Sequence, residues 1–197
     1  MSTEALIKKE EKKEELAVRK PESENIPGSF DLQEMIASFG SIELTQEQQA
    51  VLFAPPADEE IDIRPDGLIY APWTSYAKRL RAVFGMAWGM VPGGEPKMSG
   101  ELVVRPYFLV VRGKPVGAAM GECKYSIRNA TMTWGDAIEG ARSNALSRLC
   151  KGIGMMLELW EHGFGERWRD KHAKLVIKDG KQIWVRKDSL TGQASAK

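Results

Sequence analysis

The stretch EGARSNALSRLCKGIGMMLELW, residues Glu139–Trp160, decides the fold because it carries the longest helical pattern in the chain. When successive residues are placed roughly 100° apart, one side collects apolar side chains, and Leu146 and Leu157 widen it. The central residues of this apolar stripe are Ile138, Ala145, Leu149, Ile153 and Met156. An apolar stripe must be covered by another layer, so we expect this helix to pack on a sheet.

Another flank of the same helix is polar. Asn144, Arg148 and Lys151 follow i, i+4, i+7 spacing, and no carboxylate lies three or four residues away on that flank to pair with the two cations. Two cations beside an amide suit a row of backbone phosphates. A solvated helix face is the commoner explanation for such residues, and the helix by itself does not overturn it.

Three residues of the helix fit neither flank. Arg142 falls near the apolar stripe, where we expect a subunit contact. Gly152 and Gly154 each cost about 1 kcal/mol relative to Ala inside a helix. We therefore expect a bend or a close neighbour at these two glycines.

Shorter patterns surround the long helix. The expected elements are a helix capped by Ser29 or Asp31, a helix capped by Thr45, a helix from Thr74 or Ser75 to Gly85, strands in 101–113 and 115–127 joined by an RGKP turn, and a hairpin in 174–187 about Asp179-Gly180. Helices, then strands, then a long helix predict an α+β fold. We expect an antiparallel β-sheet packed on a long α-helix, with flexible termini.

The distribution of charge divides the chain. Residues 1–60 hold 6 Lys and Arg against 14 Asp and Glu, a net charge of −8, whereas residues 61–197 hold 22 against 13, a net charge of +9. This asymmetry favours a polyanionic partner such as nucleic acid for the basic part, although ordinary solvated charge explains it equally well. We expect an acidic arm with short helices over 1–60, a core domain over 61–172, and a basic hairpin and tail over 173–197.

Further cations and aromatic residues are candidates for binding nucleic acid. Lys78, Arg79 and Arg81 lie on the earlier helix, Lys124 and Arg128 lie on or beside the strands, and Trp168 and Arg169 lie where aromatic residues alternate with cations. A tryptophan in such a run either stacks on bases or is buried, and the sequence leaves both alternatives open.

Several classes of protein are disfavoured. Cys123 and Cys150 are the two cysteines, which is too few for a secreted disulfide scaffold, and no apolar run approaches the roughly 18 residues of a membrane helix. The N-terminal residues resemble neither a signal peptide nor a mitochondrial presequence, so we expect the cytoplasm of a bacterium or of a phage-infected cell. The sequence shows no spacing typical of metal ligands, no phosphate-binding loop, and no nucleophile beside a base. We therefore expect no cofactor, metal or catalytic residue. A metal-dependent nuclease is the less favoured alternative.

The motifs PDGLIYAP, RAVFG, WG, VVRPYFLVVRG, GE, EGARSNALSRLCKGIG and ELW occur in this order between Ile61 and His172. This ordered series resembles the fungal mitochondrial genome maintenance family, a branch of the Rad-fifty-two-like single-strand annealing proteins. The fungal family has two adjacent cysteines where this chain has Leu149-Cys150, which places any redox role of such a pair in doubt.

The resemblance implies a DNA-binding protein of homologous recombination and DNA repair that assembles into a ring or filament. Single-stranded DNA would lie in a basic groove, and complementary strands would be annealed to duplex without nucleotide hydrolysis. The match places DNA-contacting cations at Arg148 and Lys151, with a further one at Lys78 or Arg79. A single-strand-binding protein or an exonuclease is an expected partner, and a module that only recruits recombination partners is the alternative.

Overall fold

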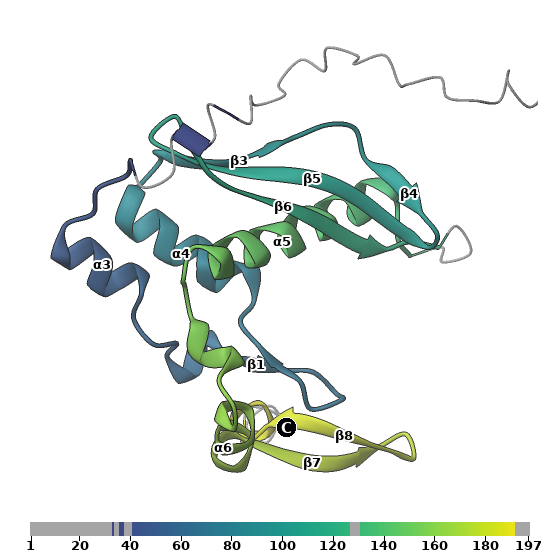
Figure 1. The fold of residues 1–197 in the computed structure, drawn as a ribbon. Coiled ribbons are helices and arrows are strands. Elements are labelled where there is room, and N and C mark those ends of the chain that lie inside the picture. The colour runs from purple at the N-terminus through teal and green to yellow at the C-terminus, as the bar shows by residue number, and fades with distance from the viewer. Residues whose placement is uncertain (1–32, 34–35, 38–40, 127–130, 192–197) are drawn as a thin grey trace, which may run out of the picture.

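The computed structural model describes residues 33, 36, 37, 41–126 and 131–191 (Figure 1). Its helices are α3 (Gln46–Leu52), η1 (Asp58–Glu60), α4 (Trp73–Phe84), α5 (Trp134–Gly152), η2 (Leu157–Trp160), α6 (Phe164–His172) and α7 (Asp188–Thr191). Its strands are β1 (Asp62–Ile63), β2 (Ile69–Tyr70), β3 (Trp88–Pro92), β4 (Lys97–Ser99), β5 (Leu102–Val111), β6 (Lys114–Lys124), β7 (Ala173–Lys178) and β8 (Lys181–Arg186). The mixed composition with antiparallel sheets confirms the predicted α+β class.

The largest sheet is built around β5. Strands β3 and β4 pair with successive halves of one edge of β5, and β6 pairs with the other edge. The β5–β6 hairpin turns through Arg112 and Gly113, both with positive φ (50° and 77°), as a tight two-residue turn with right-handed strand twist requires. The predicted turn at RGKP is confirmed, whereas β3 and β4 were not predicted as strands.

Helix α5 lies along β5 and β6 (Figure 1). The contact is close because glycine stands where the layers meet: a Cβ atom on Gly121 of β6 would overlap the Ala141 carbonyl group, and one on Gly140 would lie 2.6 Å from Cys123 Sγ. The small residues Ala137, Ala141 and Ala145 are buried on this side of α5. Alanines and glycines thus set the distance between helix and sheet.

Helix α5 ends earlier than its sequence pattern predicts. Its last residue is Gly152; the amide of Met155 donates to the Cys150 carbonyl (3.0 Å) and that of Gly154 to the Lys151 carbonyl (3.0 Å), with Gly154 at φ 97°. These two bonds and the positive φ form a Schellman C-terminal cap. Gly154 therefore terminates the helix, whereas Gly152 is its last residue and has no close neighbour among the residues that the structure describes.

The early end of α5 changes which side chains face the core. Met156 follows the cap in a left-handed conformation and is buried, as is Met155, whereas Leu157 is 50% exposed. The predicted apolar stripe is therefore correct at Ala145 and Leu149 and wrong at Leu157, because the helical period stops at the cap.

The main core lies between the sheet, α4 and α5. Leu52 of α3, Tyr76 and Leu80 of α4, Leu109 of β5 and Leu149 of α5 are all nearly inaccessible and form one cluster. Thr45 is the N-cap of α3, as predicted, and its side chain accepts a hydrogen bond from the amide of Gln48. Residues before 61 therefore contribute to this core, although the sequence pattern assigns them to the arm.

A second, smaller core joins the C-terminal hairpin to the β1–β2 pair. Trp168 of α6 and Ala173 of β7 pack with Ile61, Ile63 and Ile69. Strands β7 and β8 pair about Asp179-Gly180, whose φ angles of 51° and 73° confirm the predicted turn. In Figure 1 this hairpin and α6 lie below the layer formed by α5 and the large sheet.

Two expectations concern residues that lie largely outside the described part of the chain. They are the helix capped by Ser29 or Asp31 and the flexibility of the termini. The boundaries of the three predicted domains stay predictions. None of the described helices has the length and hydropathy needed to cross a membrane.

Candidate nucleic-acid interface

The polar flank of α5 faces the edge of β6 that is opposite β5. Arg148 reaches across this seam and places Nη1 3.1 Å and Nη2 2.9 Å from the two carboxylate oxygens of Glu122, while Nη1 also donates to the Met120 carbonyl (3.0 Å). Asn144 Oδ1 accepts from the Glu122 amide at 3.3 Å. No carboxylate three or four residues away on α5 pairs with Arg148, as its sequence indicates, but Glu122 of the sheet does, so Arg148 is not an unpaired cation.

In this pair the guanidinium group of Arg148 binds the Glu122 carboxylate through two parallel N–H groups. The hydrogen bond from Arg148 and its positive charge keep the pKa of the Glu122 carboxyl below its usual value. Both side chains remain accessible, at 42% for Arg148 and 37% for Glu122, so solvent and ions reach the pair. A pair this exposed contributes little to folding stability and can exchange its anion.

Lys151 lies one turn further along α5, next to its C-terminal cap. Its Nζ atom is 4.6 Å from the ring centroid of Trp160, which is 53% exposed. The last residues of α5 thus present a cation, with an accessible indole beside it. Asn144, Arg148 and Lys151 together are called the phosphate edge below.

Arg79 does not face solvent. Only 7% of the residue is exposed, and its guanidinium group donates to the carbonyls of Ala54 and Pro55 and to both carboxylate oxygens of Glu60. Burial would raise the pKa of Glu60, but hydrogen bonds from Arg79 and from the Ala57 amide outweigh it and lower the pKa. Arg79 therefore ties the segment after α3 to α4, which removes it from the residues accessible to DNA.

Trp168 and Arg169 belong to the second core. Trp168 is 4% exposed and stacks on His172, with ring centroids 5.1 Å apart, so it is closed to bases. Arg169 Nη1 donates to the Gly67 carbonyl (2.9 Å), and its guanidinium carbon lies 5.7 Å from the ring centroid of Trp184. Both residues attach α6 to the strands around it.

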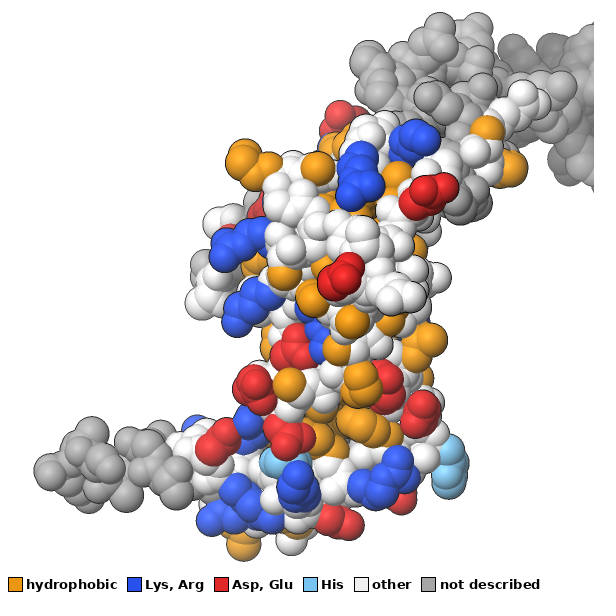
Figure 2. Space-filling model, turned by 90° about the vertical axis from the view of Figure 1, so that its left-hand side faces the viewer, with side chains coloured by type: hydrophobic (Ala, Val, Ile, Leu, Met, Phe, Trp, Pro, Cys, Tyr) orange, Lys and Arg blue, Asp and Glu red, His pale blue; other side chains and the backbone are white. Residues whose placement is uncertain are grey.

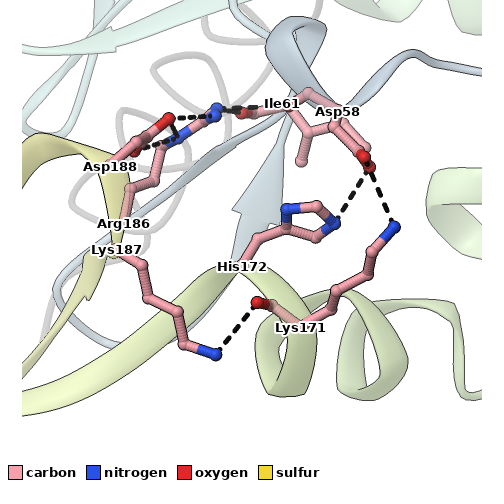
Figure 3. Close-up of polar contacts among 7 residues, drawn as sticks. All are labelled: Asp58, Ile61, Lys171, His172, Arg186, Lys187 and Asp188. Atoms are coloured by element: carbon pink, nitrogen blue, oxygen red, sulfur yellow. Dashed lines mark hydrogen bonds and ion pairs between the residues drawn. The ribbon is translucent and has the colours of Figure 1, made fainter.

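Polar contacts fasten the same region (Figure 3). The Arg186 guanidinium binds the Asp188 carboxylate and the Ile61 carbonyl, while His172 Nε2 lies 3.1 Å and Lys171 Nζ lies 3.6 Å from the Asp58 carboxylate. Cations in this region are therefore engaged with acids and carbonyls. The lower part of Figure 2, where blue and red side chains are interleaved, shows the same mixture.

The remaining predicted residues are scattered. Lys124 is exposed at the end of β6 and lies 3.0 Å from Glu101, and Arg128 lies outside the described residues.

Lys78 and Arg81 are exposed on α4, beside two tryptophans that were not predicted to bind DNA. These are Trp73, the first residue of α4, and Trp88, the first residue of β3. Trp73 and Arg81 share a helix face at i, i+8 spacing, a signal that the sequence already contained.

Within the residues that the structure describes, no three His, Cys, Asp or Glu side chains are grouped so that they could hold a metal ion. Cys150 is buried, and this burial raises the pKa of its thiol to about 12.

Comparison with known proteins places the chain in a family. Residues 31–194 match the family described as mitochondrial genome maintenance MGM101. The chain belongs to this family. The resemblance inferred from the motifs is confirmed, and the match extends beyond Ile61–His172 on both sides.

Several relatives from eukaryotes are similar to this chain. The mitochondrial genome maintenance protein MGM101 of Candida parapsilosis is 34% identical over 168 residues, covering 82% of this chain and 62% of the relative. The protein of the same name from Kluyveromyces lactis is 38% identical over 156 residues, covering 76% and 58%. A homologue from Dictyostelium discoideum is 37% identical over 123 residues, covering 62% and 32%. The chain thus spans less than two thirds of the length of these relatives.

The names of these relatives correct one expectation. They are mitochondrial genome maintenance proteins of fungi and of Dictyostelium, so the placement in a bacterial or phage-infected cytoplasm is wrong.

Proposed function

We propose that this protein binds single-stranded DNA by its phosphates and anneals complementary strands without nucleotide hydrolysis. Its family is named for maintenance of a genome, and annealing of single strands is one way to restore broken DNA. Annealing requires that a strand be held by its backbone while the base edges stay free to pair. Cations on a rigid helix satisfy this requirement, since they bind phosphate without reading sequence.

The observation that carries the proposal is the fork of Arg148 on Glu122. A guanidinium group that binds two carboxylate oxygens, at 3.1 and 2.9 Å, has the geometry for two phosphate oxygens as well. Glu122 therefore occupies the place that a phosphate takes when DNA binds. Lys151 lies one turn away and supplies the next positive charge along the strand.

A double substitution tests the phosphate edge. Arg148→Ala with Lys151→Ala should weaken binding of a fluorescent oligothymidylate and reduce the slope of log affinity against log salt by about 1.4, since each phosphate contact on a single strand contributes about 0.7. Fluorescence anisotropy at several salt concentrations measures both quantities. Lys174→Ala with Lys178→Ala on the exposed hairpin strand β7 removes the same charge as a control. An unchanged salt slope in the first variant would refute the assignment.

Annealing is tested separately from binding. Two complementary oligonucleotides carrying donor and acceptor dyes should anneal faster with the wild-type protein, without nucleotide, and no faster than the spontaneous rate with the Arg148 and Lys151 variant. Light scattering on both proteins measures whether they form the homo-oligomer that we propose for the active form. If the wild-type protein binds the oligonucleotides but does not accelerate their annealing, the annealing role is refuted and only single-strand binding is supported.

A further inference from the structure

A groove on the other flank of α5 contains aromatic and cationic side chains outside the phosphate edge. It consists of two adjoining hollows of about 180 and 280 Å³, and Trp73 and Trp88 line both. The first hollow reaches Arg142 and Glu139 of α5, and the second reaches Lys78 and Arg81 of α4. The groove therefore lies between α4, β3 and the first half of α5, whereas Arg148 of the phosphate edge faces β6.

Trp73 is the more accessible of the two tryptophans that line this groove. It is 48% exposed although it is a large aromatic residue on a regular helix. Trp88 is partly buried and packs against the main core, so its ring is held in place. One fixed indole and one accessible indole on a shared surface form a platform on which a flat ring can stack.

The charge around the platform favours an anion. Three cations, Lys78, Arg81 and Arg142, line the groove with a single acid, Glu139. Arg142 Nη1 lies 3.4 Å from a Glu139 oxygen, but both side chains are more than half exposed, so this ion pair is weak and open to competition. A ligand with a flat apolar part and a negative backbone fits this arrangement.

We propose that this groove binds nucleobases of single-stranded DNA, with Trp73 as the stacking residue and Lys78, Arg81 and Arg142 at the neighbouring phosphates. The inference rests on the proposed function and adds a base-contacting site to it. The volume of each hollow is below roughly 300 Å³, the lower limit for pockets that bind drug-sized ligands. Hollows of this size fit single bases. Stacking on aromatic rings beside cations is how proteins bind single strands without sequence preference.

The experiment compares two strands of equal length, oligothymidylate and an abasic deoxyribose phosphate strand. Trp73→Leu keeps an apolar side chain but removes the ring. It should weaken binding of oligothymidylate by at least about fivefold, the lower end of what one stacked base contributes, and leave binding of the abasic strand unchanged. Trp134→Leu is the control, because Trp134 is also exposed but packs edge-on against Tyr125 outside the groove. Urea unfolding verifies that both variants are folded.

The outcomes separate this inference from the proposed function. The Arg148 and Lys151 variant should lose affinity for both strands, since it removes phosphate contacts. If the wild-type protein binds both strands equally and Trp73→Leu changes neither affinity, the groove is no base site, while phosphate binding stands. No binding of either strand by the wild-type protein overturns both proposals. As a second measurement, Glu139→Gln should raise the affinity for oligothymidylate, and a decrease would contradict a strand in the groove.

Discussion

Replacing Arg79 by alanine should destabilise the fold and leave the phosphate edge intact. The Arg79 guanidinium group is nearly enclosed, with 8% of its side chain exposed, and its partner Glu60 is 21% exposed. The substitution would leave the Glu60 carboxylate without its cation and the carbonyls of Ala54 and Pro55 without their donor. Arg79 and Glu60 join α4 to the segment that leads from α3 into β1.

The size of the effect follows from burial. Removing one partner of a buried ion pair costs about 3–5 kcal/mol, because the remaining charge keeps its desolvation penalty without its attraction. For a chain of this length, 1 kcal/mol shifts the melting temperature by about 2–4 °C, so the expected decrease is roughly 6–20 °C. Lys78→Ala removes the same charge one residue earlier, at an exposed position, and should change stability by less than about 0.5 kcal/mol.

Urea unfolding followed by tryptophan fluorescence measures the free energy of unfolding of both variants. Oligothymidylate binding is then measured under conditions in which each variant is folded. If Arg79→Ala unfolds at the same urea concentration as the wild type but loses affinity for DNA, Arg79 is a DNA ligand, and the structural role derived from its burial is refuted.

The same pair predicts a dependence on pH. The pKa of Glu60 is lowered in the folded protein, so the stability from its ionised form is present above its unfolded pKa of about 4.5 and is lost as the pH falls through the lower folded pKa. In Arg79→Ala this stabilisation is absent. The difference in unfolding free energy between wild type and variant should therefore be largest near neutral pH and shrink below the unfolded pKa. A difference that grows on acidification would contradict the pairing.

Two substitutions and one labelling experiment probe other parts of the molecule. Glu122→Gln should free Arg148 and raise the affinity for oligothymidylate at low salt, and unchanged binding would mean that the carboxylate does not compete with phosphate. Gly121→Ala should destabilise the fold by about 1–3 kcal/mol in urea unfolding, because the added methyl group overlaps the Ala141 carbonyl where α5 meets β6. Burial raises the pKa of Cys150 to about 12, so one of the two thiols should react with Ellman's reagent in the folded protein and both in urea.

Local signals predicted many of the elements. Thr45 is a helix cap, Asp179-Gly180 is a hairpin turn, and the predicted long helix forms as far as Gly152, because caps, tight turns and periodicity depend on neighbouring residues in the sequence. The end of α5 was misjudged. The glycine that closes the Schellman cap lies inside an apolar pattern that continues past it, and periodicity alone does not show where a helix stops.

The sequence by itself determined the family, the α+β class and the cations from which any DNA site must be built. Only the tertiary structure decided what each cation does, since that depends on partners distant in sequence. Arg79 meets Glu60 and is buried, Arg148 meets Glu122 at an accessible seam, and Trp73 and Trp88 line one groove. Periodicity shows which side of its own helix a residue occupies, whereas the element that covers this side is set by packing.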